Sequence, residues 1–93
     1  MPRFIIERTW DDLDDQAMDE AGARSKRLAK ERYPEITWEH SHVVVDPDGA
    51  VKSFCVYVAP EPGMLSRHAE ELGQHHVDRI YEVAGDISPN DFP

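Results

Sequence analysis

The sequence has only one cysteine, Cys55, among its 93 residues. A single cysteine excludes a disulfide within the chain and favours a reducing compartment. Long apolar runs are also absent: only three apolar residues stand between Arg3 and Glu7, so the start of the chain does not resemble a signal peptide. No stretch approaches the length that crosses a membrane. These absences predict a soluble cytoplasmic protein with no membrane partner.

Basic residues are scarce, with 10 lysines and arginines against 19 aspartates and glutamates and a net charge of −9. This charge repels a phosphate backbone and argues against a nucleic-acid partner. The basic residues between Arg24 and Arg32 form one cluster, but Asp19, Glu20 and Glu31 flank it, which is typical of a solvated helix face. A phosphate-binding glycine loop and the GxSxG and HExxH motifs are also missing, so no reaction class is indicated.

Hydrophobic periodicity and turn residues indicate a single domain, residues 1–93, with strands separated by helices. We expect strands over residues 3–10 and 77–87, and a β-hairpin over residues 35–57. Residues 88–93 contain two prolines and form a flexible tail.

Two helices are predicted by apolar residues at helical spacing. The first covers residues 13–33, with Asp11 or Asp12 as its cap and Pro34 closing it. The second lies between Pro62 and Gly73, because proline suits a first helical turn and glycine suits the end of a helix.

The order strand, helix, strand, strand, helix, strand predicts an α+β, ferredoxin-like βαββαβ sandwich. Its antiparallel four-stranded sheet has both helices on one face. The second face of the sheet is bare, and a domain this small gains much from covering it. The mixture of aromatic and ionisable residues expected there is typical of a face that meets a second copy, a ligand or both. We therefore expect a homodimer, as a dimeric α+β barrel or sandwich.

The turn at residues 46–49, DPDG, leaves the hairpin register open between a three-residue and a four-residue loop. The three-residue loop sets His40 opposite Val56, and we expect it to bury His40 and His42 against the helices. The four-residue loop sets His40 opposite Cys55 and separates aliphatic from ionisable residues, so it is the prediction. The aliphatic face then holds Val43, Val45, Phe54, Val56 and Val58. The bare face holds Trp38, His40, His42, Ser53, Cys55 and Tyr57, joined by Ile5, Glu7, Thr9, Ile80 or Tyr81, and Glu82.

His40 and His42 are two residues apart on a strand, so both imidazoles can project the same way. Glu7, Glu82 and Cys55 can converge with them from neighbouring strands. Imidazole, carboxylate and thiolate together suit nickel, zinc or copper, whereas magnesium and calcium prefer oxygen ligands. The alternative is a pair of half-buried strand histidines, one of them bonded to a tyrosine.

The remaining candidates also have plain structural interpretations. His68 lies on the apolar side of the second helix, where a histidine bonded to a backbone carbonyl is the alternative to a ligand. His75 and His76 fall in a loop and face solvent. Cys55 has no CxxC companion and is more often a small buried hydrophobic residue than a nucleophile.

The segments RFIIERT, WEHSHVVVD, FCVYVAP, RHAEELG and VDRIYEV occur in the order and with the gaps of a known family. From Pro2 to about Ile87 the chain resembles a widespread bacterial family of small proteins of unknown function. The characterised representative of that family is described as a nickel-binding protein with a ferredoxin-like fold. The resemblance implies a homodimer, metal binding through histidines and acids at the surface or interface, and no established reaction. It points to Glu7, His40, Ser41, Cys55, Tyr57, His68 and Glu82.

Two places depart from the family pattern. His42 stands where the family tends to have tyrosine, and His75-His76 replaces a small residue or proline. Both changes add potential ligands.

The leading hypothesis is a small homodimeric protein that binds a divalent metal ion, nickel or zinc, near the bare sheet face. The second is a dimeric α+β-barrel enzyme or ligand-binding protein with an organic substrate on that face, His40 or Glu82 as general base and Tyr57 orienting the substrate. The third is a dimeric interaction module without a ligand. The candidate metal ligands are Glu7, His40, His42, Cys55, His68 and Glu82, and the candidate ligand pocket is formed by Trp38, Ser41 and Tyr57.

Overall fold

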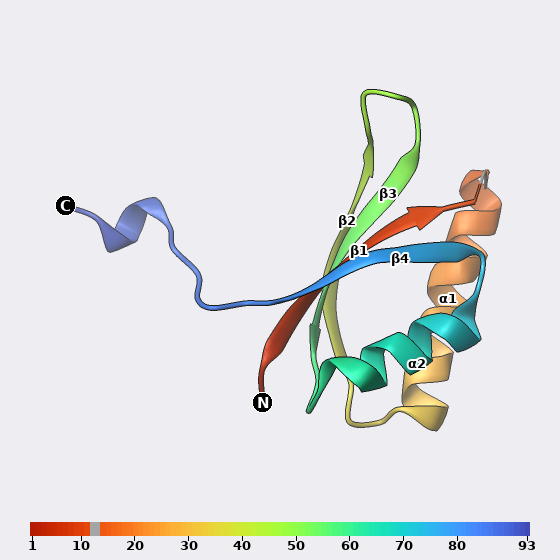
Figure 1. The fold of residues 1–93 in the computed structure, drawn as a ribbon, viewed down its shortest axis with the longest axis horizontal. Helices are drawn as coiled ribbons and strands as arrows, with labels where there is room; N and C mark the ends of the chain where they lie inside the picture. Colours follow the sequence, from red (N-terminus) through yellow and green to blue (C-terminus); the bar gives the residue numbers. More distant parts are fainter. Residues whose placement is uncertain (12–13) are drawn as a thin grey trace.

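The computed structural model describes residues 1–11 and 14–93. It confirms the predicted βαββαβ order and the α+β, ferredoxin-like fold. The elements are β1 (Arg3–Trp10), α1 (Asp15–Arg32), β2 (Thr37–Val45), β3 (Val51–Val58), α2 (Pro62–Leu72), β4 (His75–Glu82) and a short 3₁₀ turn, η1 (Pro89–Asp91). The strands form one antiparallel sheet in the order β2-β3-β1-β4, and both helices lie on the same side of it (Figure 1).

Local sequence explains where the helices begin and end. Asp14 caps α1, because its carboxylate accepts a hydrogen bond from the Ala17 amide at 2.7 Å. The predicted cap was Asp11 or Asp12; Asp12 and Leu13 lie outside the described residues. Gly73 ends α2. Its φ is 72°, and its amide donates a hydrogen bond to the Ala69 carbonyl in the last turn of the helix. Neither helix, within residues 1–11 and 14–93, is both long and apolar enough to cross a membrane.

The hydrophobic core lies between the sheet and the two helices. Alternate residues of β1 and β3 point into it, so Phe4 pairs with Tyr57 and Ile6 with Cys55 across the two central strands. Leu65 of α2 packs against this group from the helix side. This pairing fixes the helix-covered face, and the opposite side of the sheet is the open face.

The prediction of a four-residue loop in the hairpin is wrong. Val45 lies opposite Val51, and the Asp46 amide donates to the Ala50 carbonyl at 2.9 Å, so the loop has three residues. The Asp46 carboxylate accepts from the amides of Asp48 and Ala50, both at 2.9 Å, which holds the loop in this form. Gly49 completes it with a φ of 88°, as three-residue loops require.

A β-bulge at Glu39, between Trp38 and His40, decides which way β2 presents its side chains. Trp38 pairs with Tyr57 on the helix-covered face, whereas His40 pairs with Val56 and points to the open face. The expectation that a three-residue loop would bury the histidines is therefore wrong. The expectation that Cys55 and Tyr57 share a face with them is also wrong, because β1 commits both to the core.

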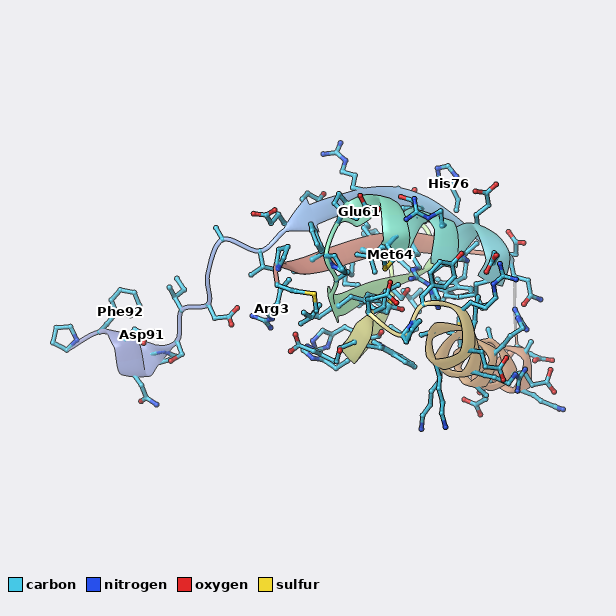
Figure 2. The ribbon with its side chains drawn as sticks, turned by 90° about the horizontal axis from the view of Figure 1, so that it is seen from below. Arg3, Glu61, Met64, His76, Asp91 and Phe92 are labelled. Atoms are coloured by element: carbon cyan, nitrogen blue, oxygen red, sulfur yellow. The ribbon has the colours of Figure 1, made fainter. Side chains whose placement is uncertain are left out.

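The last strand also differs from the prediction. β4 begins at His75 and ends at Glu82, earlier at both ends than the predicted strand over residues 77–87. Beyond it the chain leaves the domain as an extended segment, with Asp91 and Phe92 well away from the sheet (Figure 2). An ion pair between Arg3 and Asp86, at 2.6 Å, attaches the start of this segment to β1.

Candidate functional site

The histidine pair lies on the open face, as the sequence predicts. The rings of His40 and His42 are nearly perpendicular, with centroids 5.3 Å apart, and both side chains are exposed. Beside them Phe54, Val56 and Ile5 form the floor of a shallow hollow of about 370 Å³. The pair therefore stands at the rim of an apolar depression, open to solvent and to any second molecule.

A charged cluster occupies the same face nearer to β4. Lys52 donates to Glu7 at 2.8 Å and lies 3.5 Å from Asp78, and the Tyr81 hydroxyl donates to Glu7 at 3.2 Å. The hydrogen bond from Lys52 lowers the pKa of Glu7, and the same bond raises the pKa of Lys52. Glu7 is thus an ionised carboxylate that already has two partners.

Glu7 does not converge with the histidines. Across the sheet His42 pairs with Phe54, and Phe54 pairs with Glu7, so β3 separates the carboxylate from the imidazole. Two strand spacings amount to about 10 Å, which is too far for both groups to bind one ion. Glu7 therefore lies on the same face as His40 and His42 but is not part of the same metal site.

The other predicted metal ligands lie on the helix-covered side. Cys55 is buried and its thiol donates to the Ser53 hydroxyl at 3.4 Å, as expected of a small buried hydrophobic residue. Glu82 pairs with Phe4 and so projects to the helix side at an exposed end of the sheet. Tyr57 is on this side too, so it and His40 cannot act on one substrate at the open face.

His68 is a core histidine hydrogen-bonded to a backbone carbonyl. It is fully buried, and its Nε2 donates to the Ser25 carbonyl at 3.1 Å. Tyr33 and Tyr57 surround the ring, with centroids 5.8 and 6.1 Å away. Burial lowers its pKa, so it is a neutral structural residue. The structure therefore agrees with the alternative interpretation of His68 from the sequence, a histidine bonded to a backbone carbonyl, and not with a metal ligand.

His75 and His76 begin β4 and do not lie in a loop. The ring of His75 stacks on Trp10, with centroids 4.6 Å apart, and its Nδ1 bonds the Gly73 carbonyl at 2.7 Å. Burial lowers the pKa of His75. The expectation of a solvent-facing residue is therefore wrong for His75, whereas the side chain of His76 is exposed and points away from the helices (Figure 2).

The six candidate ligands therefore separate into groups. His40 and His42 stand together, Glu7 stands apart on the same face, and the other three lie on the opposite side of the sheet. Among the residues that the structure describes, no three His, Cys, Asp or Glu side chains gather closely enough to hold a metal ion. One chain thus supplies two neighbouring imidazoles and no complete coordination sphere.

The three predicted pocket residues do meet, but beneath the helices. Trp38, Ser41 and Tyr57 line a cavity of about 130 Å³ between α1 and the covered face of the sheet. Arg8, which the sequence reading missed, lines the same cavity and is only 1% exposed. The alternation of Phe4 and Ile6 continues directly to this arginine, so the period of the strand was the signal that placed it in the core.

Comparison with known proteins adds the family. Residues 4–83 match the protein family described as nickel responsive protein SCO4226-like. The chain belongs to this family. Among solved structures it is similar to the crystal structure of SCO4226 from Streptomyces coelicolor A3(2), with 20% sequence identity and a TM-score of 0.68, over 91% of this chain and 99% of that one. No curated protein matches the chain.

A second similar structure is the solution structure of the C-terminal domain of the MgtC protein from Mycobacterium tuberculosis. The identity is 16% and the TM-score 0.61, over 91% of this chain and 88% of that one. At these identities both likenesses show the fold alone. The SCO4226-like match begins in β1 and ends at Val83, so it includes the histidine pair and the cavity and leaves out the tail.

Proposed function

We propose that this SCO4226-like protein binds a divalent metal ion, nickel first, at His40 and His42 in a homodimer formed through the open sheet face. One observation carries the proposal: two exposed imidazoles stand side by side, with ring centroids 5.3 Å apart, on the sheet face opposite the two helices (Figure 1). Imidazole nitrogen is a ligand that suits nickel, copper and zinc. The description of the family as nickel responsive supports placing nickel first.

The second copy is needed because two ligands do not complete a site. A twofold axis near the pair would bring the same two histidines from each copy together, because a symmetric dimer uses the same patch on both subunits. Four imidazoles suit the tetragonal geometry of nickel(II) or copper(II), or the tetrahedral geometry of zinc. The divalent affinity order favours copper over nickel, so availability decides which ion is carried.

The composition of the open face supports pairing of two copies. The apolar floor of the hollow lies beside Val44, which is 37% exposed, and Tyr81, which is 43% exposed. Covering this surface contributes free energy that a 93-residue domain has difficulty supplying from its own core.

Calorimetry tests the proposal on untagged protein from which metal has been chelated, with nickel and zinc as titrants. We expect one ion per two chains, and at least about tenfold weaker binding for His40→Ala and for His42→Ala, since even outer-shell changes weaken metal sites by that factor. His76→Ala is the matched control, because it removes an exposed histidine elsewhere. Binding no tighter than millimolar, or equal binding by His40→Ala and wild type, contradicts the proposal.

A further inference from the structure

Arg8 is a buried cation whose side chain is incompletely bonded. Its Nη2 donates to the Tyr57 hydroxyl at 3.2 Å, and its guanidinium lies 5.6 Å from the centre of that ring. Its Nε has no hydrogen-bond partner in the part of the chain that the structure describes. Among the described residues no carboxylate lies within ion-pair distance of it, although the sheet bears ion pairs on its other face. Burying a cation without an anion costs free energy, so an anionic ligand beside Arg8 would be stabilised there.

The cavity beside this arginine has the size and walls of a small-ligand site. Its volume of about 130 Å³ is close to that of an engineered apolar cavity that holds benzene. Met18, Gly22 and Leu72 form the helix side of its wall, and Trp10 and Trp38 form part of the sheet side. The walls are thus mostly apolar and include both tryptophans of the chain.

The polar groups in the wall are left with protons to donate. The Ser53 hydroxyl accepts from Trp10 Nε1 at 2.8 Å, and the Ser41 hydroxyl accepts from Trp38 Nε1 at 2.9 Å. The Tyr57 hydroxyl accepts from Arg8. A hydroxyl that accepts retains its own proton for donation, as does the unpartnered Arg8 Nε. Such a set favours a ligand that only accepts.

We propose that this cavity binds a small monocarboxylate whose oxygens meet Arg8 and Tyr57 and whose apolar body lies between the indoles of Trp10 and Trp38. An aromatic or branched aliphatic acid matches the volume and the walls. A single guanidinium balances one negative charge, so a phosphate dianion would keep an unbalanced charge among apolar groups. The cavity lies across the sheet from the histidine pair, so this inference does not rest on the metal proposal.

Titration with benzoate and isobutyrate, against benzamide and isobutyramide as neutral matches, tests the charge. Both indoles line the cavity, so tryptophan fluorescence reports occupancy directly, and calorimetry gives the affinity. We expect each carboxylate to bind about ten- to a hundredfold more tightly than its amide, the range of a hydrogen bond to a charged group. Inorganic phosphate should leave the fluorescence unchanged. Equal binding of acid and amide, or tightest binding of phosphate, overturns the proposal.

Two variants separate a binding role of Arg8 from a structural one. Arg8→Met removes the charge and keeps an apolar stem, and it should fold and lose about ten- to a hundredfold in benzoate affinity. Gly22→Leu fills the cavity from α1 without altering Arg8, because the Cβ position of Gly22 meets no atom within 4 Å. It should abolish binding, whereas its control Gly22→Ala should retain it.

Wild-type benzoate affinity in Arg8→Met contradicts the inference. If Arg8→Met fails to fold, the Gly22 pair decides: equal binding by Gly22→Leu and Gly22→Ala would show that Arg8 is structural and that the acid binds elsewhere.

Discussion

The two faces of this sheet satisfy their polar groups in different ways. On the open face the charged groups bond one another, as Lys52 does with Glu7 and Arg3 with Glu39, both at 2.8 Å. On the covered side the buried nitrogens Arg8 Nε, His68 Nδ1 and His75 Nε2 have no hydrogen-bond partner within residues 1–11 and 14–93. These open-face charges are thus paired, although the face has no covering helix, whereas the covered side contains a cavity and buried nitrogens without a hydrogen-bond partner.

This difference explains why the two proposals call for different kinds of partner. A face with exposed apolar residues beside paired charges is suited to a second protein surface. A pocket whose polar groups still have hydrogen-bond donors available is suited to a small anion. Neighbouring residues of one strand serve the two faces in alternation, so paired substitutions one residue apart test the contrast directly.

The largest expected effect is on stability, from the pair Ile6→Ala and Ile5→Ala in β1. Ile6 is fully buried beneath the helices, so its truncation should lower the free energy of unfolding by about 2–5 kcal/mol. Ile5 is half-buried on the open face, and its truncation should lower the free energy of unfolding by only about 1 kcal/mol. Urea unfolding at low protein concentration measures both. Similar losses would mean that the open face is packed as tightly as the covered one.

A second pair tests the proposed dimer through the open face. Val44 points to the open face and Val45 to the other side of the same strand, with 37% and 69% exposure. Val44→Glu should weaken the dimer by about 3 kcal/mol, roughly a hundredfold in Kd, because it places like charges at a symmetric contact. Val45→Glu is the control and should leave the dimer intact. Sedimentation velocity measures both, and the reverse order would move the interface to the helix side of the hairpin.

The fold was predictable from the sequence because each element has its own periodicity and its own turn residues. The hairpin register was not, because the DPDG turn admits two loops and hydrophobic patterning favoured the wrong one. Alternation predicts that Trp38 and His40 lie on the same face, but the bulge at Glu39 places them on opposite faces. A bulge adds one residue without changing the alternation of residue types on either side, so the sequence bears little trace of it.

The site was predictable only in part. His40 and His42 are two residues apart, and this spacing brings their imidazoles together in any register. Whether Cys55 shares their face depends on pairing between strands distant in sequence, which spacing cannot supply. Arg8 was missed because a buried arginine contradicts the usual preference for the surface, even though the period of β1 places it inward.

The buried histidines predict a smaller, pH-dependent effect. Burial holds the pKa of His68 below the value of 6.5 that it has when unfolded, so the unfolded chain takes up the proton first. Stability should be fully present above about pH 6.5 and should fall with acidification by up to about 1.4 kcal/mol per pH unit, until the lower folded pKa is passed. His75 adds to the loss in the same direction.

Urea unfolding between about pH 8 and about pH 5 measures this slope. His68→Gln keeps a donor for the Ser25 carbonyl and should reduce the slope of stability against pH. His76→Gln is the control for removing one imidazole. Glu7 and Asp78, whose pKa values are also lowered, contribute only at more acidic pH. An unchanged slope in His68→Gln would assign the acid sensitivity to other groups.

The smallest expected effect concerns the turn that sets the two faces of β2. Gly49 has a φ of 88°, which a side chain tolerates poorly, so Gly49→Ala should lower the free energy of unfolding by about 1 kcal/mol. Gly85→Ala is the control, since Gly85 has no positive φ and a Cβ there meets no atom within 4 Å. Nickel affinity should not change in Gly49→Ala, because the pairing of Trp38 with Tyr57 and the bulge at Glu39 hold the histidines on the open face independently of the turn. A loss of nickel binding with only a small loss of stability would show that the turn itself, and not the strand pairing, determines the face on which the histidines lie.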